Sequence, residues 1–124
     1  MAKTIFLIDD SGAMLMSLRD NLEFSGFNVE TAENGAKAID KLTAGLKPDL
    51  IITDINMPNM DGIELIKTVR TLPGFRFVPI LTLTTEANQD KREEGKHAGA
   101  TGWLVKPIKI VDLLKIIKQV LPGV

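Results

Sequence analysis

The sequence contains no cysteine and only one histidine among its 124 residues. Without cysteine the chain cannot form a disulfide, use a thiol nucleophile or hold a metal through thiolates. The single histidine, His97, has no second imidazole or thiolate to complete a transition-metal site. These absences exclude thiol chemistry and argue against a transition-metal centre.

The sequence also lacks a strong charge of either sign and a long apolar run. Its 15 basic and 16 acidic residues give a net charge of −1, so no basic field indicates nucleic acid or an anionic membrane. No apolar run approaches the ~20 residues of a transmembrane helix, and the apolar segment before Asp9 is too short for the core of a signal peptide. We therefore expect a cytoplasmic protein that binds neither nucleic acid nor membranes.

Short apolar runs alternate with segments of helical periodicity along the chain. We expect strands at residues 5–8, 27–32, 50–52, 78–83 and 103–105, with a helix after each. Ser11 is a plausible N-cap for the first helix, and the fourth helix, at about 88–98, is polar on almost every side. This alternation predicts an α/β fold of the (βα)₅ type with a parallel sheet covered on both faces. The first, third and fourth runs are the most apolar, which favours the flavodoxin-like strand order 2-1-3-4-5.

Polar side chains follow four of these strands at the carboxyl end. Asp9 and Asp10 follow the first, and Asp54 follows the third. Thr84 follows the fourth and Lys106 follows the fifth. Because ligands of such sheets bind beyond the carboxyl ends of the strands, we expect three carboxylates, a hydroxyl and an ammonium group at one rim.

Three neighbouring carboxylates repel one another unless a cation compensates their charge. Mg²⁺, or Mn²⁺, suits such a set of oxygen ligands, and we expect Asp10 and Asp54 to bind it directly and Asp9 to bind it through a water molecule. A carboxylate can also attack phosphorus and form an aspartyl phosphate. Asp54 is the best nucleophile because it is the single acid after the central third strand. Lys106 and Thr84 would then stabilise the phosphoryl oxygens.

This pattern resembles the receiver domains of two-component response regulators. The family pattern consists of an acid pair, an acceptor Asp, a Thr or Ser, and a Lys followed by Pro. The resemblance extends over the whole chain, includes the segments 54–62 and 98–103, and is close to the chemotaxis members of the family. It implies a phosphorylation-dependent switch rather than an enzyme, which takes its phosphoryl group from a sensor histidine kinase. We expect one receiver domain over residues 1–124, without an effector domain, that acts as a monomer.

The resemblance also implies roles for residues around the acid cluster. The backbone carbonyl of Asn56 would be a further metal ligand, and the side chains of Asn56 and Glu86 would modulate the lifetime of the phosphoryl group. Trp103 stands where the family usually has Tyr or Phe, and this ring would turn inward as Thr84 moves toward the phosphoryl group. The peptide bond before Pro107 would be cis.

Several functions remain open at this stage. A chemotaxis regulator would bind a motor-switch protein through the fourth helix, fifth strand and fifth helix. A phosphorelay shuttle would instead engage a histidine phosphotransfer domain near the first helix, where Met14, Leu15 and Leu18 lie. The enzyme alternative is an aspartate-nucleophile phosphatase of the haloacid dehalogenase type. That class needs a second Asp two residues after the nucleophile, a position that Asn56 occupies here.

Overall fold

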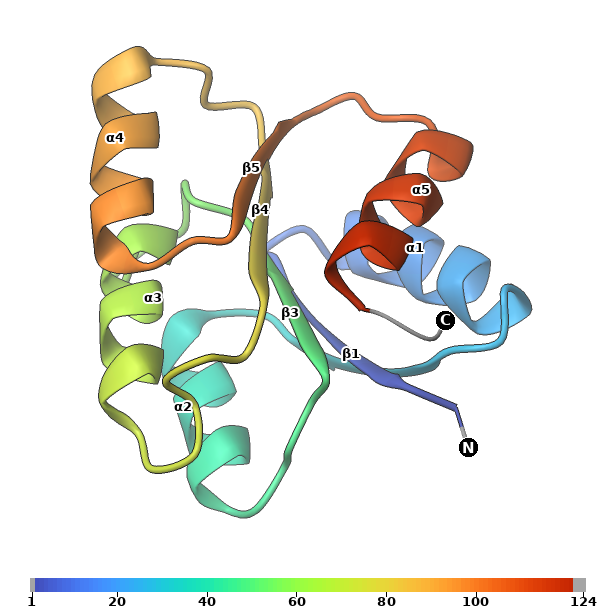
Figure 1. Cartoon of the computed structure of the whole chain (residues 1–124), viewed down its shortest axis with the longest axis horizontal. Helices are drawn as coiled ribbons and strands as arrows, with labels where there is room; N and C mark the ends of the chain where they lie inside the picture. Colours follow the sequence, from blue (N-terminus) through green and yellow to red (C-terminus); the bar gives the residue numbers. More distant parts are fainter. Residues whose placement is uncertain (1, 122–124) are drawn as a thin grey trace.

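Five parallel strands form a single sheet in the computed structural model, which describes residues 2–121 (Figure 1). The strands are β1 (Thr4–Ile8), β2 (Asn28–Ala32), β3 (Leu50–Thr53), β4 (Ile80–Thr84) and β5 (Gly102–Val105). Their order across the sheet is β2-β1-β3-β4-β5, so the predicted order is confirmed. The three most apolar strands lie at the centre, where both of their faces are covered.

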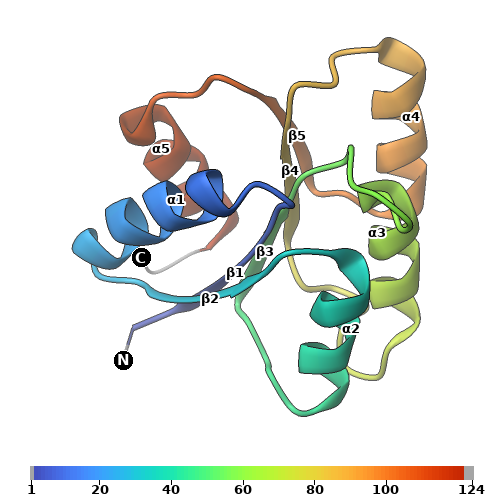
Figure 2. The ribbon, with the colours of Figure 1, turned by 180° about the vertical axis from the view of Figure 1, so that it is seen from behind.

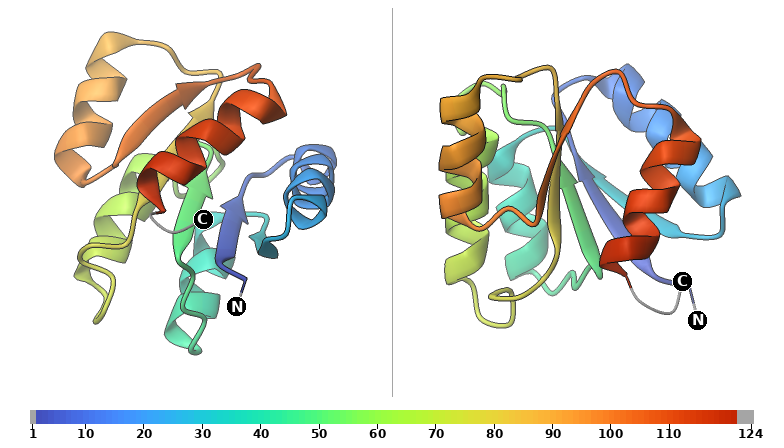
Figure 3. Two further views of the ribbon diagram at one scale, coloured as in Figure 1. Left: turned by 45° about the vertical axis from the view of Figure 1, so that its right-hand side comes forward. Right: turned by 45° about the horizontal axis from the view of Figure 1, so that its top comes forward.

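Helices cover both faces of the sheet (Figures 1 and 2). They are α1 (Gly12–Phe24), α2 (Gly35–Thr43), α3 (Gly62–Thr71), α4 (Gln89–Ala98) and α5 (Ile110–Val120). Helices α1 and α5 lie on one face, and α2, α3 and α4 lie on the other (Figure 3). Within the described residues, none of these helices has the length and apolar character needed to cross a membrane.

Four helices begin at a side chain that accepts a hydrogen bond from the first turn. These N-caps are Ser11, Asn34, Asp61 and Asn88. Each satisfies a backbone N–H that the helix itself leaves unpaired. Helix α5 follows Lys109 without such a side-chain bond. Four of the five helices therefore begin at a residue fixed by a side-chain hydrogen bond.

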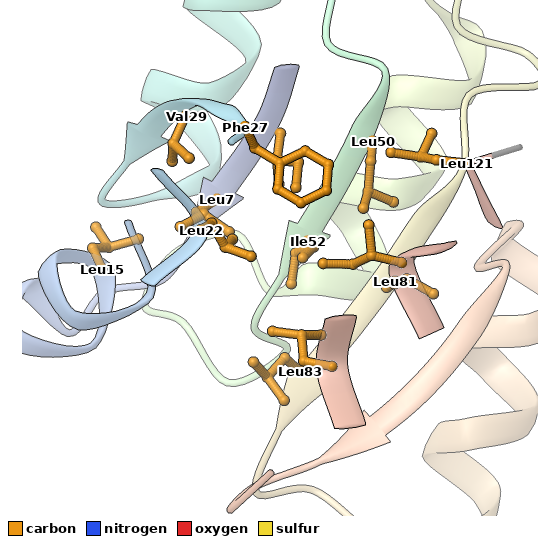
Figure 4. Packing of buried hydrophobic residues seen from close by; sticks show 13 residues of the cluster. Leu7, Leu15, Leu22, Phe27, Val29, Leu50, Ile52, Leu81, Leu83 and Leu121 are labelled. Carbon is orange, nitrogen blue, oxygen red and sulfur yellow. The ribbon is translucent and has the colours of Figure 1, made fainter. Parts of the chain in front are cut away.

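The core consists of two layers, one on each face of the sheet, because successive strand side chains point to opposite faces. Leu7, Ile52 and Leu81 belong to the layer that α1 and α5 cover (Figure 4). The intervening strand residues belong to the other layer, which packs against α2 and α3; they include Phe6, Ile51 and Ile80. Strands buried on both faces explain why these segments read as continuous apolar runs in the sequence.

Two strands begin later than the sequence pattern predicts. Phe27 ends the turn after α1, because its N–H donates to the carbonyl of Leu22 at 3.1 Å, so β2 starts at Asn28. Strand β4 starts at Ile80, after Pro79, which has no N–H to donate to a neighbouring strand. Neither difference moves a residue of the predicted site.

Candidate functional site

Three carboxylates meet at the carboxyl ends of β1 and β3. Asp9, Asp10 and Asp54 each place one carboxylate oxygen within 4.8 Å of the others. These residues converge because β1 and β3 are hydrogen-bonded neighbours, and the Asp54 N–H donates to the Ile8 carbonyl at 2.9 Å. Asp9 and Asp54 are buried, whereas Asp10 is exposed. The structure thus brings together the acidic residues that the sequence predicts at this rim.

Backbone amides hold the two buried carboxylates in place. One oxygen of Asp9 accepts a hydrogen bond from the Ser11 N–H at 2.9 Å. One oxygen of Asp54 accepts from the Ile55 N–H at 2.7 Å. The second oxygen of each carboxylate faces Lys106, whose Nζ lies 2.8 Å from Asp9 Oδ2 and 3.5 Å from Asp54 Oδ2. Each carboxylate therefore has one fixed oxygen and one oxygen directed into the cluster.

The amine of Lys106 is the cation of this cluster. Burial alone would lower its pKa, but the hydrogen bond and charge of Asp9, together with the charge of Asp54, raise the pKa above its ordinary value. The amine therefore stays protonated at neutral pH. One positive charge faces three negative ones, so the cluster carries excess negative charge. This set of hard oxygen donors fits Mg²⁺ or Mn²⁺.

Thr84 and Trp103 are connected through the backbone of Glu86. The Thr84 hydroxyl is fully buried at the end of β4 and accepts a hydrogen bond from the Glu86 N–H at 3.2 Å. The Glu86 carbonyl in turn accepts from the Trp103 indole N–H at 2.9 Å. The ring of Trp103 is half-buried on β5. Just beyond β5, the peptide bond between Lys106 and Pro107 is cis, as predicted.

Comparison with known proteins identifies this arrangement. The model of the response regulator receiver domain family matches residues 5–118. The chain belongs to this family. Receiver domains are signalling switches that accept a phosphoryl group, not enzymes, and their place in two-component systems implies a histidine kinase partner.

Solved structures resemble this receiver domain closely. The chemotaxis protein CheY4 of Vibrio cholerae is 42% identical, with a TM-score of 0.93, and the match covers 98% of this chain and 100% of CheY4. The Mn²⁺-bound form of response regulator Rcp1 is 25% identical, with a TM-score of 0.81, over 98% of this chain and 96% of Rcp1. A similar fold thus occurs in a protein with a metal ion bound.

A curated relative is a longer protein. The transcriptional regulatory protein PrrA of Mycobacterium tuberculosis is 37% identical to the receiver domain over 117 residues, which make up 94% of this chain and 49% of PrrA. The chain spans about half the length of the curated relatives that it matches. The sequence similarity to these regulators is therefore limited to the half of each protein that aligns with this receiver domain.

Gly62 is a residue of the site that the sequence pattern does not single out, because a lone glycine before a helical segment resembles an ordinary turn or cap glycine. Gly62 is the first residue of α3, and its N–H donates to the Ile55 carbonyl at 2.8 Å. A Cβ at this position would collide with the carbonyl oxygen of Asp54 and lie 2.8 Å from the Ile55 Cα. Gly62 therefore lets the receiver domain pack the start of α3 directly against the backbone of Asp54.

Proposed function

We propose that Asp54 is the phosphoacceptor, which receives its phosphoryl group from a histidine kinase in a Mg²⁺-dependent reaction. The geometry of its carboxylate carries the proposal. Asp54 Oδ1 is held by the Ile55 amide, and Oδ2 faces the protonated amine of Lys106 at 3.5 Å. Because both ends of the carboxylate are held, one of its oxygens can attack phosphorus in line with the leaving group. Positioning of this kind is the main demand of phosphoryl transfer.

Asp10 and Asp54 would hold the metal directly and Asp9 would hold it through a water molecule, with the Asn56 carbonyl as a further ligand. The excess negative charge of the cluster supports this assignment. When bound, the ion supplies positive charge that neutralises the carboxylates and the phosphoryl oxygens. The Mn²⁺-bound relative Rcp1 also supports it.

Lys106 and Thr84 would stabilise the transferred group. The protonated amine of Lys106 would pair with a phosphoryl oxygen, and the buried hydroxyl of Thr84 would donate to another. The hydroxyl is suited to this task because it already accepts a hydrogen bond from Glu86 and keeps its own hydrogen free to donate. The side chains of Asn56 and Glu86, at positions 2 residues beyond Asp54 and Thr84, would set the lifetime of the phosphoryl group.

Chemotaxis output through α4, β5 and α5 is the pathway that we favour. The similarity to CheY4 over nearly the whole of both chains supports it. A surface pocket of about 520 Å³ lies between α4 and β5 and would receive part of a motor-switch protein; its lining includes Gln89, Arg92, Glu93, Lys96 and Trp103. Val105 and Val111 add exposed apolar surface on β5 and α5.

A phosphorelay shuttle is the second candidate, because another groove lies beside the acid cluster. This groove of about 350 Å³ is lined by Met14 and Leu18 of α1, by Lys106, and by Ile108 and Leu113 around the start of α5. It would receive a helix of a histidine phosphotransfer domain next to the Lys106 amine. Lys96→Glu in the first pocket and Leu18→Glu in the second distinguish the candidates. A chemotaxis output would lose partner binding with Lys96→Glu, and a shuttle would lose phosphotransfer with Leu18→Glu.

The acceptor assignment is tested by intact-mass spectrometry after incubation with acetyl phosphate. We expect one phosphoryl adduct on the native chain in the presence of Mg²⁺, and none after chelation of the metal or in Asp54→Asn. Asp40→Asn is the matched control, because Asp40 is an exposed residue of α2 that does not belong to the acid cluster. An adduct of native yield in Asp54→Asn would refute the assignment of Asp54.

A further inference from the structure

Helix α4 exposes most of its side chains to solvent. Its residues are strongly polar, and Gly95 is the only one that is buried. At its carboxyl end, Arg70 of α3 donates hydrogen bonds to the Gly99 carbonyl from Nε at 3.2 Å and from Nη2 at 2.6 Å. This end of α4 is therefore fixed to α3, and the buried Gly95 lies one turn before Gly99, whose N–H donates to the Gly95 carbonyl at 3.1 Å.

Gly95 touches the indole ring of Trp103. A Cβ at position 95 would lie 2.6 Å from Cζ3 and 2.9 Å from Cε3 of that ring, which is closer than carbon atoms can approach. The backbone of Gly95 has no left-handed φ angle, so glycine is needed here for space and not for conformation. Glycine is unfavourable in the middle of a helix, and the close approach of the ring accounts for its presence.

The same ring is connected to the site through two hydrogen bonds. The indole N–H of Trp103 donates to the Glu86 carbonyl at 2.9 Å, and the Glu86 N–H donates to the Thr84 hydroxyl at 3.2 Å. One edge of the indole thus reports on the position of Thr84, and its opposite edge lies against Gly95. The Trp103 ring is therefore the group that joins the backbone after Thr84 to α4.

We propose that Gly95 is a positioning residue: its missing side chain holds the Trp103 indole between the Glu86 carbonyl and α4, so that a change at Thr84 reaches the helix. This inference rests on the proposed phosphorylation of Asp54. The switch then requires a matched pair of residues, because an indole at position 103 needs a glycine at position 95 of the facing helix. A methyl group at position 95 would displace the ring and uncouple α4 from the site.

Gly95→Ala is the decisive variant. Alanine favours helix formation, and the half-buried ring of Trp103 can turn toward solvent, so we expect Tm to change by less than about 4 °C. Gly12→Ala is the matched control, since Gly12 is also helical, has an ordinary backbone and would place its Cβ in open space. In a Trp103→Phe background the smaller ring leaves room for the methyl group, so there Gly95→Ala is expected to have no further effect on hydrogen exchange of α4, which is the readout that does not need the tryptophan.

The readouts are tryptophan fluorescence and hydrogen exchange of α4, measured before and after activation with Mg²⁺ and beryllofluoride. Trp103 is the only tryptophan and the chain has no tyrosine, so emission reports on this ring. We expect Gly95→Ala to lose more than half of the native fluorescence change and of the change in α4 exchange, with Gly12→Ala unaffected. A response of native size in Gly95→Ala would overturn the proposal, as would an equal loss in Gly12→Ala.

Intact-mass measurement on the same samples with acetyl phosphate separates this inference from the proposed function. A native chain that takes no phosphoryl group would refute the role of Asp54. A Gly95→Ala chain that forms the adduct normally but no longer changes at α4 would support the positioning role. If that chain forms the adduct normally and α4 still responds, only the role of Gly95 fails.

Discussion

Asp10 is the exposed member of the acid cluster, and it contributes repulsion without a hydrogen bond or ion pair among the described residues. Its charge lies within 4.8 Å of two buried carboxylates, and at such a distance repulsion near water costs on the order of 1 kcal/mol. We expect Asp10→Asn to raise the free energy of unfolding of the metal-free protein by up to about 1 kcal/mol. The same variant should lose most of the stabilisation that Mg²⁺ gives the native chain.

Urea denaturation with and without Mg²⁺ measures both effects of Asp10→Asn. Asp40→Asn serves as the control, because it removes one negative charge outside the acid cluster. If Asp10→Asn destabilised the metal-free protein, the three carboxylates would not be in repulsion. If Mg²⁺ stabilised the variant as much as the native chain, Asp10 would not be a ligand.

Thr82 and Thr84 lie two positions apart on β4, and both are fully buried. The Thr84 hydroxyl accepts a hydrogen bond from Glu86, whereas the Thr82 hydroxyl has no hydrogen-bond partner within residues 2–121. A buried hydroxyl without a partner costs about 1–3 kcal/mol. Substitution by valine should therefore act in opposite directions at these two positions.

We expect Thr82→Val to raise the free energy of unfolding by about 1 kcal/mol and Thr84→Val to lower it by a similar amount. Thr84→Val leaves the Glu86 N–H without its acceptor, and it also removes the hydroxyl proposed to bind the phosphoryl group. Thermal unfolding gives the two stabilities, and fluorescence of Trp103 on activation gives the response. The expectation fails if the two variants shift stability in the same direction, or if Thr84→Val responds to beryllofluoride as the native chain does.

Arg70 holds the end of α3 to two other segments, the one before β4 and the one after α4. From the end of α3 it donates to the Gly99 carbonyl after α4 and to the carbonyls of Phe75 and Val78 before β4. Burial lowers the pKa of its guanidinium group. The three acceptors are backbone carbonyls, so its charge is solvated by peptide dipoles.

We expect Arg70→Met to lower the free energy of unfolding by about 2–4 kcal/mol, because three partly buried carbonyls lose a charged donor. Arg70→Lys should restore part of this loss, since one amine cannot reach acceptors on two segments at once. Arg19→Met is the control: Arg19 forms an exposed pair with Glu23 at 3.5 Å, and its loss should change stability by about 0.5 kcal/mol or less. Chemical denaturation measures the stability of all three variants. Equal effects of Arg70→Met and Arg19→Met would mean that the hydrogen bonds of Arg70 do not stabilise the fold.

At the level of elements, the sequence predicts the features that depend on the periodicity of apolar residues and on the positions of polar residues at strand ends. The apolar runs identify all five strands, and their order follows from which runs are most apolar. The acid cluster is predictable because parallel strands bring Asp9 and Asp54 to one edge of the sheet. Gly62, Arg70 and Gly95 could not be recognised in this way, because their roles depend on contacts between elements that are distant in the chain. Within a single sequence, each resembles an ordinary turn, surface or helix residue.

At the scale of the whole molecule, a single sheet lies between the two core layers and contributes side chains to both. This arrangement affects how the protein unfolds. Ile66 of α3 and Ile117 of α5 are both 0% exposed and lie on opposite faces of the sheet. Each residue of the central strands contacts only one layer through its side chain, but its backbone belongs to both. Loss of either layer would expose a face of the sheet, so we expect the layers to unfold together.

Ile66→Val and Ile117→Val test this cooperativity. Each variant should lower the free energy of unfolding by about 0.5–1.5 kcal/mol, because it removes one buried methylene group. The double variant should lose the sum to within about 0.5 kcal/mol, since the side chains share no partner across the sheet. Far-ultraviolet circular dichroism and Trp103 fluorescence should give coincident urea transitions in all three variants. Separate transitions by the two probes would mean that the α1 and α5 layer unfolds independently of the layer that carries α3 and α4, and the sheet would then not couple the acid cluster to the whole fold.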